Sequence, residues 1–143
     1  MPYKDLREFL KRLEREGELA RIKLEVSPIL EITEITDRVC KMPKGGKALL
    51  FEKVKDYSIP VLTNMLGSEK RIKLALGYER LEDIGWKLYK LLRPEIPHTF
   101  LEKLKRLPEL KKLNDALPKT VKDGPVRDVI KKDNIDILEF PIL

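Results

Sequence analysis

The sequence predicts an α/β (α+β) domain in which a small mixed sheet is flanked by helices. Three observations indicate this class. Apolar residues recur every three or four positions before Gly17, as on one face of a helix. Residues 19–26 then alternate between apolar and charged side chains, as in a half-buried strand. Residues 48–51 are apolar throughout, which is typical of a strand with both faces buried.

The first helix is predicted between Asp5 and Gly17. The Asp5 carboxylate can accept a hydrogen bond from the first helical turn. Gly17 stands where a left-handed residue commonly ends a helix. The apolar face of this helix consists of Leu6, Phe9, Leu10 and Leu13.

A strand, a second helix and a second strand should follow. The strand at 19–26 is expected to place four apolar residues on one side, namely Ala20, Ile22, Leu24 and Val26. Ser27-Pro28 is expected to start a helix with a broad apolar stripe of Leu30, Ile32, Ile35 and Val39. A loop at 42–46 then leads into the buried strand at 48–51.

Residues 59–62 are expected to form another strand, with Pro60 near its start or at a sheet edge, since proline cannot donate to a ladder. Helices are predicted over 69–76, stopped by Gly77, and over 81–92, stopped by the following prolines. The inward residues of the second of these are Leu81, Ile84, Leu88, Leu91 and Leu92, with Trp86 and Tyr89 beside them.

The last third of the chain changes character twice. Residues 99–118 carry leucines at helical spacing, which predicts a helix pair laid over a neighbour or, alternatively, an oligomer contact. Residues 126–130 and 135–138 are expected to be extended. The chain ends on Phe140-Pro141-Ile142-Leu143, an apolar strand with nothing to pair it, so we expect further sequence in the parent protein.

The distribution of charged residues bears on the possible partners and on the stability of the protein. The net charge is +6, yet basic and acidic side chains are interleaved and each third of the chain has only a slight basic excess. A nucleic-acid interface needs clustered lysine and arginine, so we expect no nucleic-acid partner. Charged residues make up 38% of the chain, which suits a heat-adapted protein with ion-pair networks.

Localisation is predicted from absences in the sequence. There is one cysteine, no signal peptide and no apolar run near 18 residues, so we expect a cytosolic protein with no membrane contact. Cys40 is interpreted as a small hydrophobe on the core side of its helix, with a reactive thiol as the alternative. His98 is the only histidine, so a zinc site is not expected.

Two segments could carry chemistry. Lys44-Gly45-Gly46-Lys47 is interpreted as a loop between helix and strand, although its glycines and lysines could cradle a phosphate. Glu31, Glu34 and Asp37 are spaced three apart and share one helical edge. They are interpreted as a solvated acidic face with Arg38 as partner of Glu34, and a desolvated acid–base pair is the alternative.

Taken in order, four short segments and a single glycine resemble the N-terminal domain of the UbiD-type decarboxylases. They are Gly17-Glu18-Leu19-Ala20-Arg21-Ile22, Leu30-Glu31-Ile32-Thr33-Glu34-Ile35-Thr36-Asp37-Arg38, Ala48-Leu49-Leu50-Phe51-Glu52, Ile59-Pro60-Val61-Leu62-Thr63-Asn64 and Gly67. The resemblance covers residues 3–77 well and 124–143 more loosely.

The resemblance implies a division of labour in the parent protein. Residues 1–77 would form the N-terminal α/β domain, 78–118 its helical extension, and 119–143 the extended start of a truncated flavin-binding domain with a split barrel. In that family prenylated FMN, a divalent metal and potassium lie in the domain that follows, where the flavin acts as an electron sink during non-oxidative decarboxylation. The acidic edge at 31–37 could dock onto that domain.

The resemblance therefore implies a scaffold and assembly role for this chain. None of the family's catalytic, flavin or metal positions falls within residues 1–143, so we assign no catalytic, cofactor-binding or metal residue and expect the chain to be inactive alone. The expected partners are the flavin-binding and C-terminal domains, on the same or a separate polypeptide, and possible copies of the chain itself. The alternatives are a stand-alone dimerisation or adaptor module that uses residues 101–117, and a basic nucleic-acid-binding domain.

Overall fold

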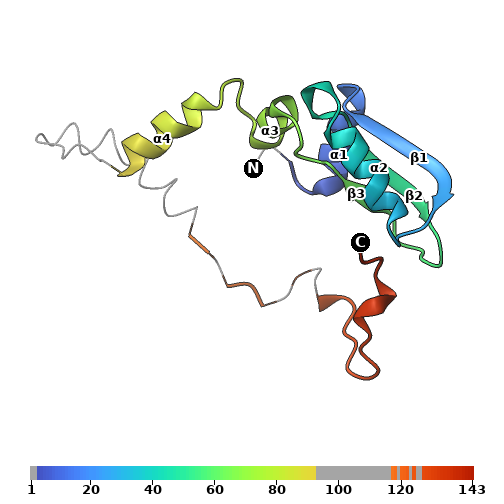
Figure 1. Cartoon of the computed structure of the whole chain (residues 1–143). Helices are drawn as coiled ribbons and strands as arrows, with labels where there is room; N and C mark the ends of the chain where they lie inside the picture. The colour runs from blue at the N-terminus through green and yellow to red at the C-terminus, as the bar shows by residue number, and fades with distance from the viewer. Residues whose placement is uncertain (1–2, 93–116, 119, 123, 125–126) are drawn as a thin grey trace, which may run out of the picture. The chain divides into compact units, whose positions relative to one another are not determined.

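The computed structural model of the chain describes residues 3–92, 117–118, 120–122, 124 and 127–143. The chain divides into two compact units, Met1–Gly85 with Asp136–Leu143, and Trp86–Ile135. The sheet and three of the helices lie in the first unit (Figure 1). The described elements are α1 (Leu6–Arg15), β1 (Leu19–Val26), α2 (Glu31–Cys40), η1 (Pro43–Gly45), β2 (Ala48–Val54), β3 (Val61–Thr63), α3 (Glu69–Leu76), α4 (Glu82–Leu92) and η3 (Ile137–Glu139).

The three strands form a mixed sheet in the order β1-β2-β3. β1 and β2 are parallel, with Leu19 opposite Ala48, and β2 and β3 are antiparallel, with Phe51 opposite Val61. Parallel neighbours need a crossover, and α2 supplies it between β1 and β2. The predicted class, a small mixed sheet flanked by helices, is confirmed.

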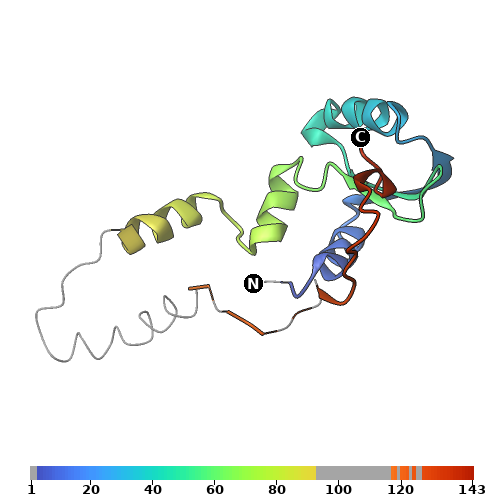
Figure 2. The same ribbon diagram turned by 90° about the horizontal axis from the view of Figure 1, so that it is seen from below.

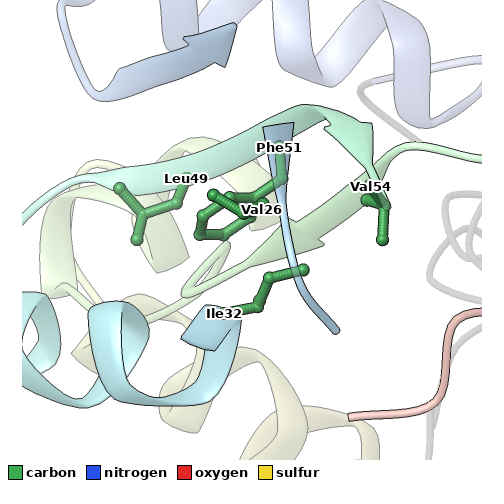
Figure 3. Packing of buried hydrophobic residues seen from close by; sticks show 5 residues of the cluster. All are labelled: Val26, Ile32, Leu49, Phe51 and Val54. Carbon is green, nitrogen blue, oxygen red and sulfur yellow. The ribbon is translucent and has the colours of Figure 1, made fainter. Parts of the chain in front are cut away.

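β2 is the central strand, and successive residues on it serve opposite faces of the sheet. Leu49 and Phe51 pack with Ile32 of α2, and Figure 3 shows these side chains gathered with Val26 of β1. On the other face Ala48 packs with residues of α1 and α3, so helices cover both sides of the sheet (Figure 2). The predicted burial of β2 on both faces is confirmed, and each large side chain so buried stabilises the fold by roughly 1.5–3 kcal/mol.

The predicted ends of the first helix are confirmed. The Asp5 Oδ1 atom accepts a hydrogen bond from the backbone N–H of Glu8 at 2.8 Å, which is the expected N-terminal cap. Gly17 follows the helix with φ of +69°, in the left-handed region. Phe9 and Leu13 are buried, whereas Leu6 at the start of the helix is half exposed.

The prediction that Leu24 lies on the same side of β1 as Ala20, Ile22 and Val26 is wrong. The register between β1 and β2 shifts between Ile22 and Glu25, so that one extra residue lies on β1. A bulge of this kind interrupts the alternation of faces. Ile22 and Val26 still reach the core, but Leu24 is 79% exposed.

The second helix begins later than predicted. Residues 27–30 form a turn, and α2 starts at Glu31. Leu30 has φ of +64° and is 76% exposed, so it does not belong to the buried stripe. Ile32 is fully buried, and Ile35 and Val39 pack against the same cluster, as expected.

The remaining predictions divide between confirmation and correction. β3 follows Pro60 and is a sheet edge, and α3 has the predicted bounds with Gly77 left-handed after it. On α4, Leu88 and Leu92 are exposed among the described residues, contrary to the predicted inward face. The leucine-rich stretch at 99–118 lies outside the described residues apart from its last two positions.

The C-terminal prediction is also corrected. No strand occurs in the described part of 127–143, and residues 137–139 form the short helix η3 instead. The Asp136 side chain accepts a hydrogen bond from the N–H of Leu138 at 2.9 Å. Such local bonds offer the backbone an alternative to a strand, which needs a neighbouring strand to pair with. The expected split barrel stays a prediction.

Candidate functional site

Arg71 on α3 is fully buried, although arginine is almost never fully buried without partners. Its Nη1 donates to Glu18 Oε2 at 3.0 Å and to the Gly46 carbonyl oxygen at 2.6 Å. Its Nη2 donates to the Gly45 carbonyl oxygen at 3.3 Å. Since Glu18 precedes β1 and the two glycines precede β2, the guanidinium ties α3 to the beginnings of both parallel strands.

The loop between β3 and α3 completes this arrangement. Asn64 Nδ2 donates to the carbonyl oxygens of Gly45 at 2.7 Å and Lys47 at 2.9 Å. A Cβ on Gly67 would lie 1.7 Å from Asn64 Oδ1 and 3.1 Å from Arg71 Nη2, so any larger residue there would displace the Asn64 amide from its present position. Glu18, Gly45, Gly46, Asn64, Gly67 and Arg71 are called the Arg71 cluster below.

Glu18 is the charged partner within the cluster. Its Oε1 also accepts from Lys70 Nζ at 3.1 Å, and Lys70 in turn reaches the Glu16 carbonyl oxygen at 3.2 Å. Burial opposes ionisation of Glu18, but hydrogen bonds from Lys70 and Arg71 outweigh it and lower the pKa of its carboxyl. The same contact with Glu18 raises the pKa of Lys70, so both groups are charged at neutral pH.

The Arg71 cluster is suited to positioning rather than to proton transfer. A guanidinium is always protonated, and its paired carboxylate stays ionised, so neither group exchanges a proton near neutral pH. Arg71 Nε is buried with no hydrogen-bond partner among the described residues. That unpaired donor lowers the net stabilisation which the cluster provides. The cluster therefore fixes three loops relative to one another.

An open groove runs beside the cluster along α1 and α3 and the loop before β2. Its charged lining residues are Glu8, Arg12, Arg15, Glu18, Lys44, Lys47, Glu69, Lys70, Lys73 and Glu79. Several are already in ion pairs, such as Arg12 with Glu16 at 2.8 Å and Lys73 with Glu69 at 2.6 Å. The lining therefore carries both signs of charge, with six basic and four acidic side chains.

The loop Lys44-Gly45-Gly46-Lys47 connects α2 to β2, and its interpretation as a connecting loop is confirmed. A phosphate cradle needs converging backbone N–H groups. Here the carbonyl oxygens of Gly45 and Gly46 face Arg71, and the Gly45 N–H donates to the Met42 carbonyl oxygen at 2.9 Å. The two glycines therefore bind the buried arginine through their carbonyl oxygens and do not form an anion site.

The three carboxylates of α2 are each held by a separate partner. Glu34 pairs with Arg38 at 2.7 Å, as predicted. Asp37 pairs with Lys41, whose pKa it raises, and Glu31 Oε2 accepts from the Ser27 N–H at 2.6 Å. All three residues are exposed, so the solvated acidic face is confirmed.

Two further candidates from the sequence are Cys40 and His98. Cys40 is exposed, so its predicted place on the core side is wrong: Ile32, Ile35 and Val39 form the face of α2 that meets the apolar cluster, and Cys40 lies off that face. His98 lies outside the described residues. Within the described residues, no group of three His, Cys, Asp or Glu could hold a metal ion. No helix in the same residues is long and apolar enough to cross a membrane.

Sequence reasoning missed the Arg71 cluster. Arg71 is separated from Glu18 by 53 residues, so no local pattern links them. A weak signal is the position of the arginine, which comes within the first turn after the Ser68 cap on the same helix as the apolar Leu74 and Ala75.

The comparison with protein families decides the identity of the fold. Residues 10–88 match the family described as the 3-octaprenyl-4-hydroxybenzoate carboxy-lyase N-terminal domain, UbiD_N. The chain belongs to the UbiD N-terminal domain family. The resemblance that the four short segments and Gly67 indicate is thereby confirmed.

Solved structures agree with this family. The UbiD N-terminal domain described here is similar to vanillic acid decarboxylase of Sedimentibacter hydroxybenzoicus, in both its open and closed forms. The identity is 40% over 60% of this chain and 19% of that chain. The TM-scores are 0.54 for the open form and 0.55 for the closed form.

Longer relatives match this UbiD N-terminal domain along its whole length. An uncharacterized protein of Aquifex aeolicus is 69% identical over 99% of this chain, which is 29% of that protein. A second, from Archaeoglobus fulgidus, is 50% identical over 100% of this chain and 28% of its own length. The chain thus spans less than a third of each of these relatives.

Proposed function

We propose that this chain is the N-terminal, non-catalytic domain of a UbiD-type carboxy-lyase, with a scaffold and assembly role. The reaction of the whole protein would be non-oxidative decarboxylation of an unsaturated or aromatic acid, of the 3-polyprenyl-4-hydroxybenzoate decarboxylase kind. The observation that carries this proposal is the family match over residues 10–88. It is supported by the 40% identity to vanillic acid decarboxylase.

The geometry of the Arg71 cluster supports the scaffold role. Its charged groups are hydrogen-bonded to one another and to backbone carbonyl oxygens. They fix the loops that precede β1, β2 and α3. Prenylated FMN, with a divalent metal and potassium, would supply the electron sink in the remainder of the protein. We assign none of the residues described here to the flavin or the metals.

The proposal extends to the organisation of the parent protein. Residues 1–77 would be the N-terminal domain proper, 78–118 its helical extension, and 119–143 the entry into the flavin-binding domain. The partners would be the flavin-binding and C-terminal domains, in a homo-oligomer within the cytosol. The lengths of the two relatives support the presence of further domains.

A chimaera tests the proposal. This chain would replace the matching residues of the A. aeolicus relative, and the unaltered relative would serve as control. We expect the chimaera to retain its flavin, as judged by visible absorption, and to release CO₂ from the same acids as the control. We expect the 143-residue chain alone to release none. Loss of flavin from the chimaera but not from the control would contradict the equivalence of the two domains. CO₂ release by the isolated chain would contradict its non-catalytic role.

A further inference from the structure

The outer face of α1 carries basic side chains at a regular spacing. Arg7, Lys11 and Arg15 are exposed and follow one another at intervals of four residues. Residues four apart on a helix share one face and are separated by about 6 Å along the axis. These three residues are called the α1 basic stripe. Phe9 and Leu13 are buried on the opposite face of the helix, so the stripe is directed away from the core.

The stripe has no acidic partner among the described residues, since none of its three side chains forms an ion pair there. The carboxylates beside it are bound elsewhere. Glu8 Oε2 accepts from the Lys4 N–H at 2.7 Å, and Glu14 Oε1 accepts from Arg21 Nε at 2.8 Å. Like charges four residues apart disfavour a helix, so the stripe does not serve the stability of α1. Three cations therefore remain available to an anion from outside the chain.

The basic surface continues beyond the helix. Arg15 also lines the open groove beside the Arg71 cluster, together with Lys44 and Lys47 of the loop before β2. Both lysines are exposed, and neither forms an ion pair with a described residue. The stripe and the groove thus share Arg15 and together present five unpaired cations, although basic and acidic residues are interleaved along the sequence.

The residues along the stripe favour one class of partner. The hollow that contains the stripe is lined by charged residues only. A protein interface has an apolar core and a membrane-bound helix inserts apolar side chains, so this face suits neither. Nucleic-acid interfaces are polar and strongly positive, and the phosphates of the backbone repeat at regular intervals. Two of the three residues of the stripe are arginines, whose guanidinium groups bind phosphate through two parallel hydrogen bonds.

We propose that the α1 basic stripe, together with Lys44 and Lys47, binds the phosphate backbone of a nucleic acid without reading its sequence. The inference goes beyond the proposed function and does not depend on it. Contacts to phosphates give affinity and orientation, whereas sequence specificity requires contacts to base edges. Binding should therefore be weak, with a Kd of about 10⁻⁴–10⁻⁶ M at physiological salt, and it should weaken steeply as the salt concentration rises.

The test compares two triple variants that have the same net charge. The first removes the stripe by Arg7→Gln, Lys11→Gln and Arg15→Gln. The second is the control and replaces by glutamine three exposed lysines without ion pairs on or next to β1 and β2, namely Lys23, Lys53 and Lys55. Fluorescence anisotropy measures binding to a labelled DNA duplex of about 20 base pairs between about 50 and 200 mM salt. Glutamine favours a helix about as well as lysine and arginine, so the stripe variant should keep its melting temperature.

The stripe variant should bind the duplex at least about tenfold more weakly at 50 mM salt. The slope of log K against log salt concentration should become shallower by about 3, which is about 1 for each lost phosphate contact. The control variant should keep the slope of the unaltered chain and change the affinity by less than about threefold. Arg7→Lys combined with Arg15→Lys should also keep the slope, because lysine retains the charge that pairs with phosphate.

Four results would overturn the inference. The unaltered chain could show no salt-dependent binding, or the two triple variants could lose affinity equally, in which case net charge alone attracts the duplex. Poly-L-glutamate could displace the duplex at the same concentration of charge, which would assign the stripe to an acidic protein instead. The folded A. aeolicus chimaera could fail to bind although the isolated chain binds, which would show that the stripe is covered in the longer protein. None of these measurements involves flavin retention or CO₂ release, so the proposed function is tested separately.

Discussion

At the scale of single residues, the structure depends on one buried guanidinium. The Arg71 guanidinium donates to three acceptors, and each lies far from α3 in the sequence. Removing one partner of such a buried ion pair is strongly destabilising, because the other charge then lies in a poorly solvated site.

Arg71→Met is therefore expected to destabilise the chain by about 3–5 kcal/mol, as measured by urea unfolding. The substitution leaves Glu18 with Lys70 alone, removes the Arg71 donor from the Gly46 carbonyl oxygen, and leaves the Gly45 carbonyl oxygen with Asn64 alone. The control is Arg80→Met, because Arg80 is 71% exposed and its ion pair with Glu82 spans 3.7 Å. It should change the stability by less than about 0.5 kcal/mol. Equal losses for both variants would show that the Arg71 cluster does not stabilise the fold.

Glu18 should make the stability depend on pH. Its pKa is lower in the folded chain than the ordinary value of 4.5, so the unfolded chain binds the proton more readily. The stabilisation is complete above that ordinary value and is lost as the pH falls through the folded pKa. Glu18→Gln should thus be less stable than the parent at pH 7, and the difference should shrink below about pH 4.5. A difference that is constant from pH 7 to pH 3, in thermal unfolding, would contradict this assignment.

At the scale of elements, the loop before β2 packs closely against the loop before α3. Gly45 and Gly17 both have positive φ, but their surroundings differ. A Cβ on Gly45 would lie 2.0 Å from the Gly67 carbonyl oxygen, whereas a Cβ on Gly17 would meet nothing within 4 Å. Backbone strain is common to both positions, and steric overlap belongs to Gly45 alone.

The pair Gly17→Ala and Gly45→Ala separates these two effects. Gly17→Ala should cost about 1 kcal/mol from backbone strain. Gly45→Ala should cost roughly 1–3 kcal/mol more, as in an overpacked core, because the loop must move away from Gly67 and Arg71. Chemical unfolding of both variants measures the difference. Equal costs would mean that the loop shifts freely and does not hold the arginine.

At the scale of the whole molecule, the packed core of the described residues lies in the first part of the chain. Both apolar clusters and the Arg71 cluster draw only on residues between Tyr3 and Ala75. The sheet and the helices α1, α2 and α3 are contained in the same range, apart from Leu76. Residues 10–75 of this range lie within the family match.

A chain that ends at Gly85 should therefore unfold cooperatively, within a few degrees of the melting temperature of the intact chain. Circular dichroism during heating measures this directly. Loss of the cooperative transition would show that residues after Gly85 belong to the same folding unit, and it would contradict the proposed domain boundary at residue 77.

Local rules in the sequence determined where most elements begin and end. Asp5 and Gly17 delimit α1, Gly77 ends α3, and the uniformly apolar run at 48–51 marks the central strand. These predictions succeed because capping, left-handed glycine and apolar periodicity act over a few residues. The family resemblance rests on the same elements, which is why the sequence alone indicated it.

Tertiary structure decided the features that depend on distant partners. Arg71 is buried because Glu18, Gly45 and Gly46 surround it, and no pattern within α3 shows that they do. Leu24 is exposed because the register with β2 shifts, and Leu30 is exposed because Ser27 and Glu31 close a turn before α2. Periodicity gives the spacing of side chains along one element, but the neighbouring elements determine which of those side chains are covered.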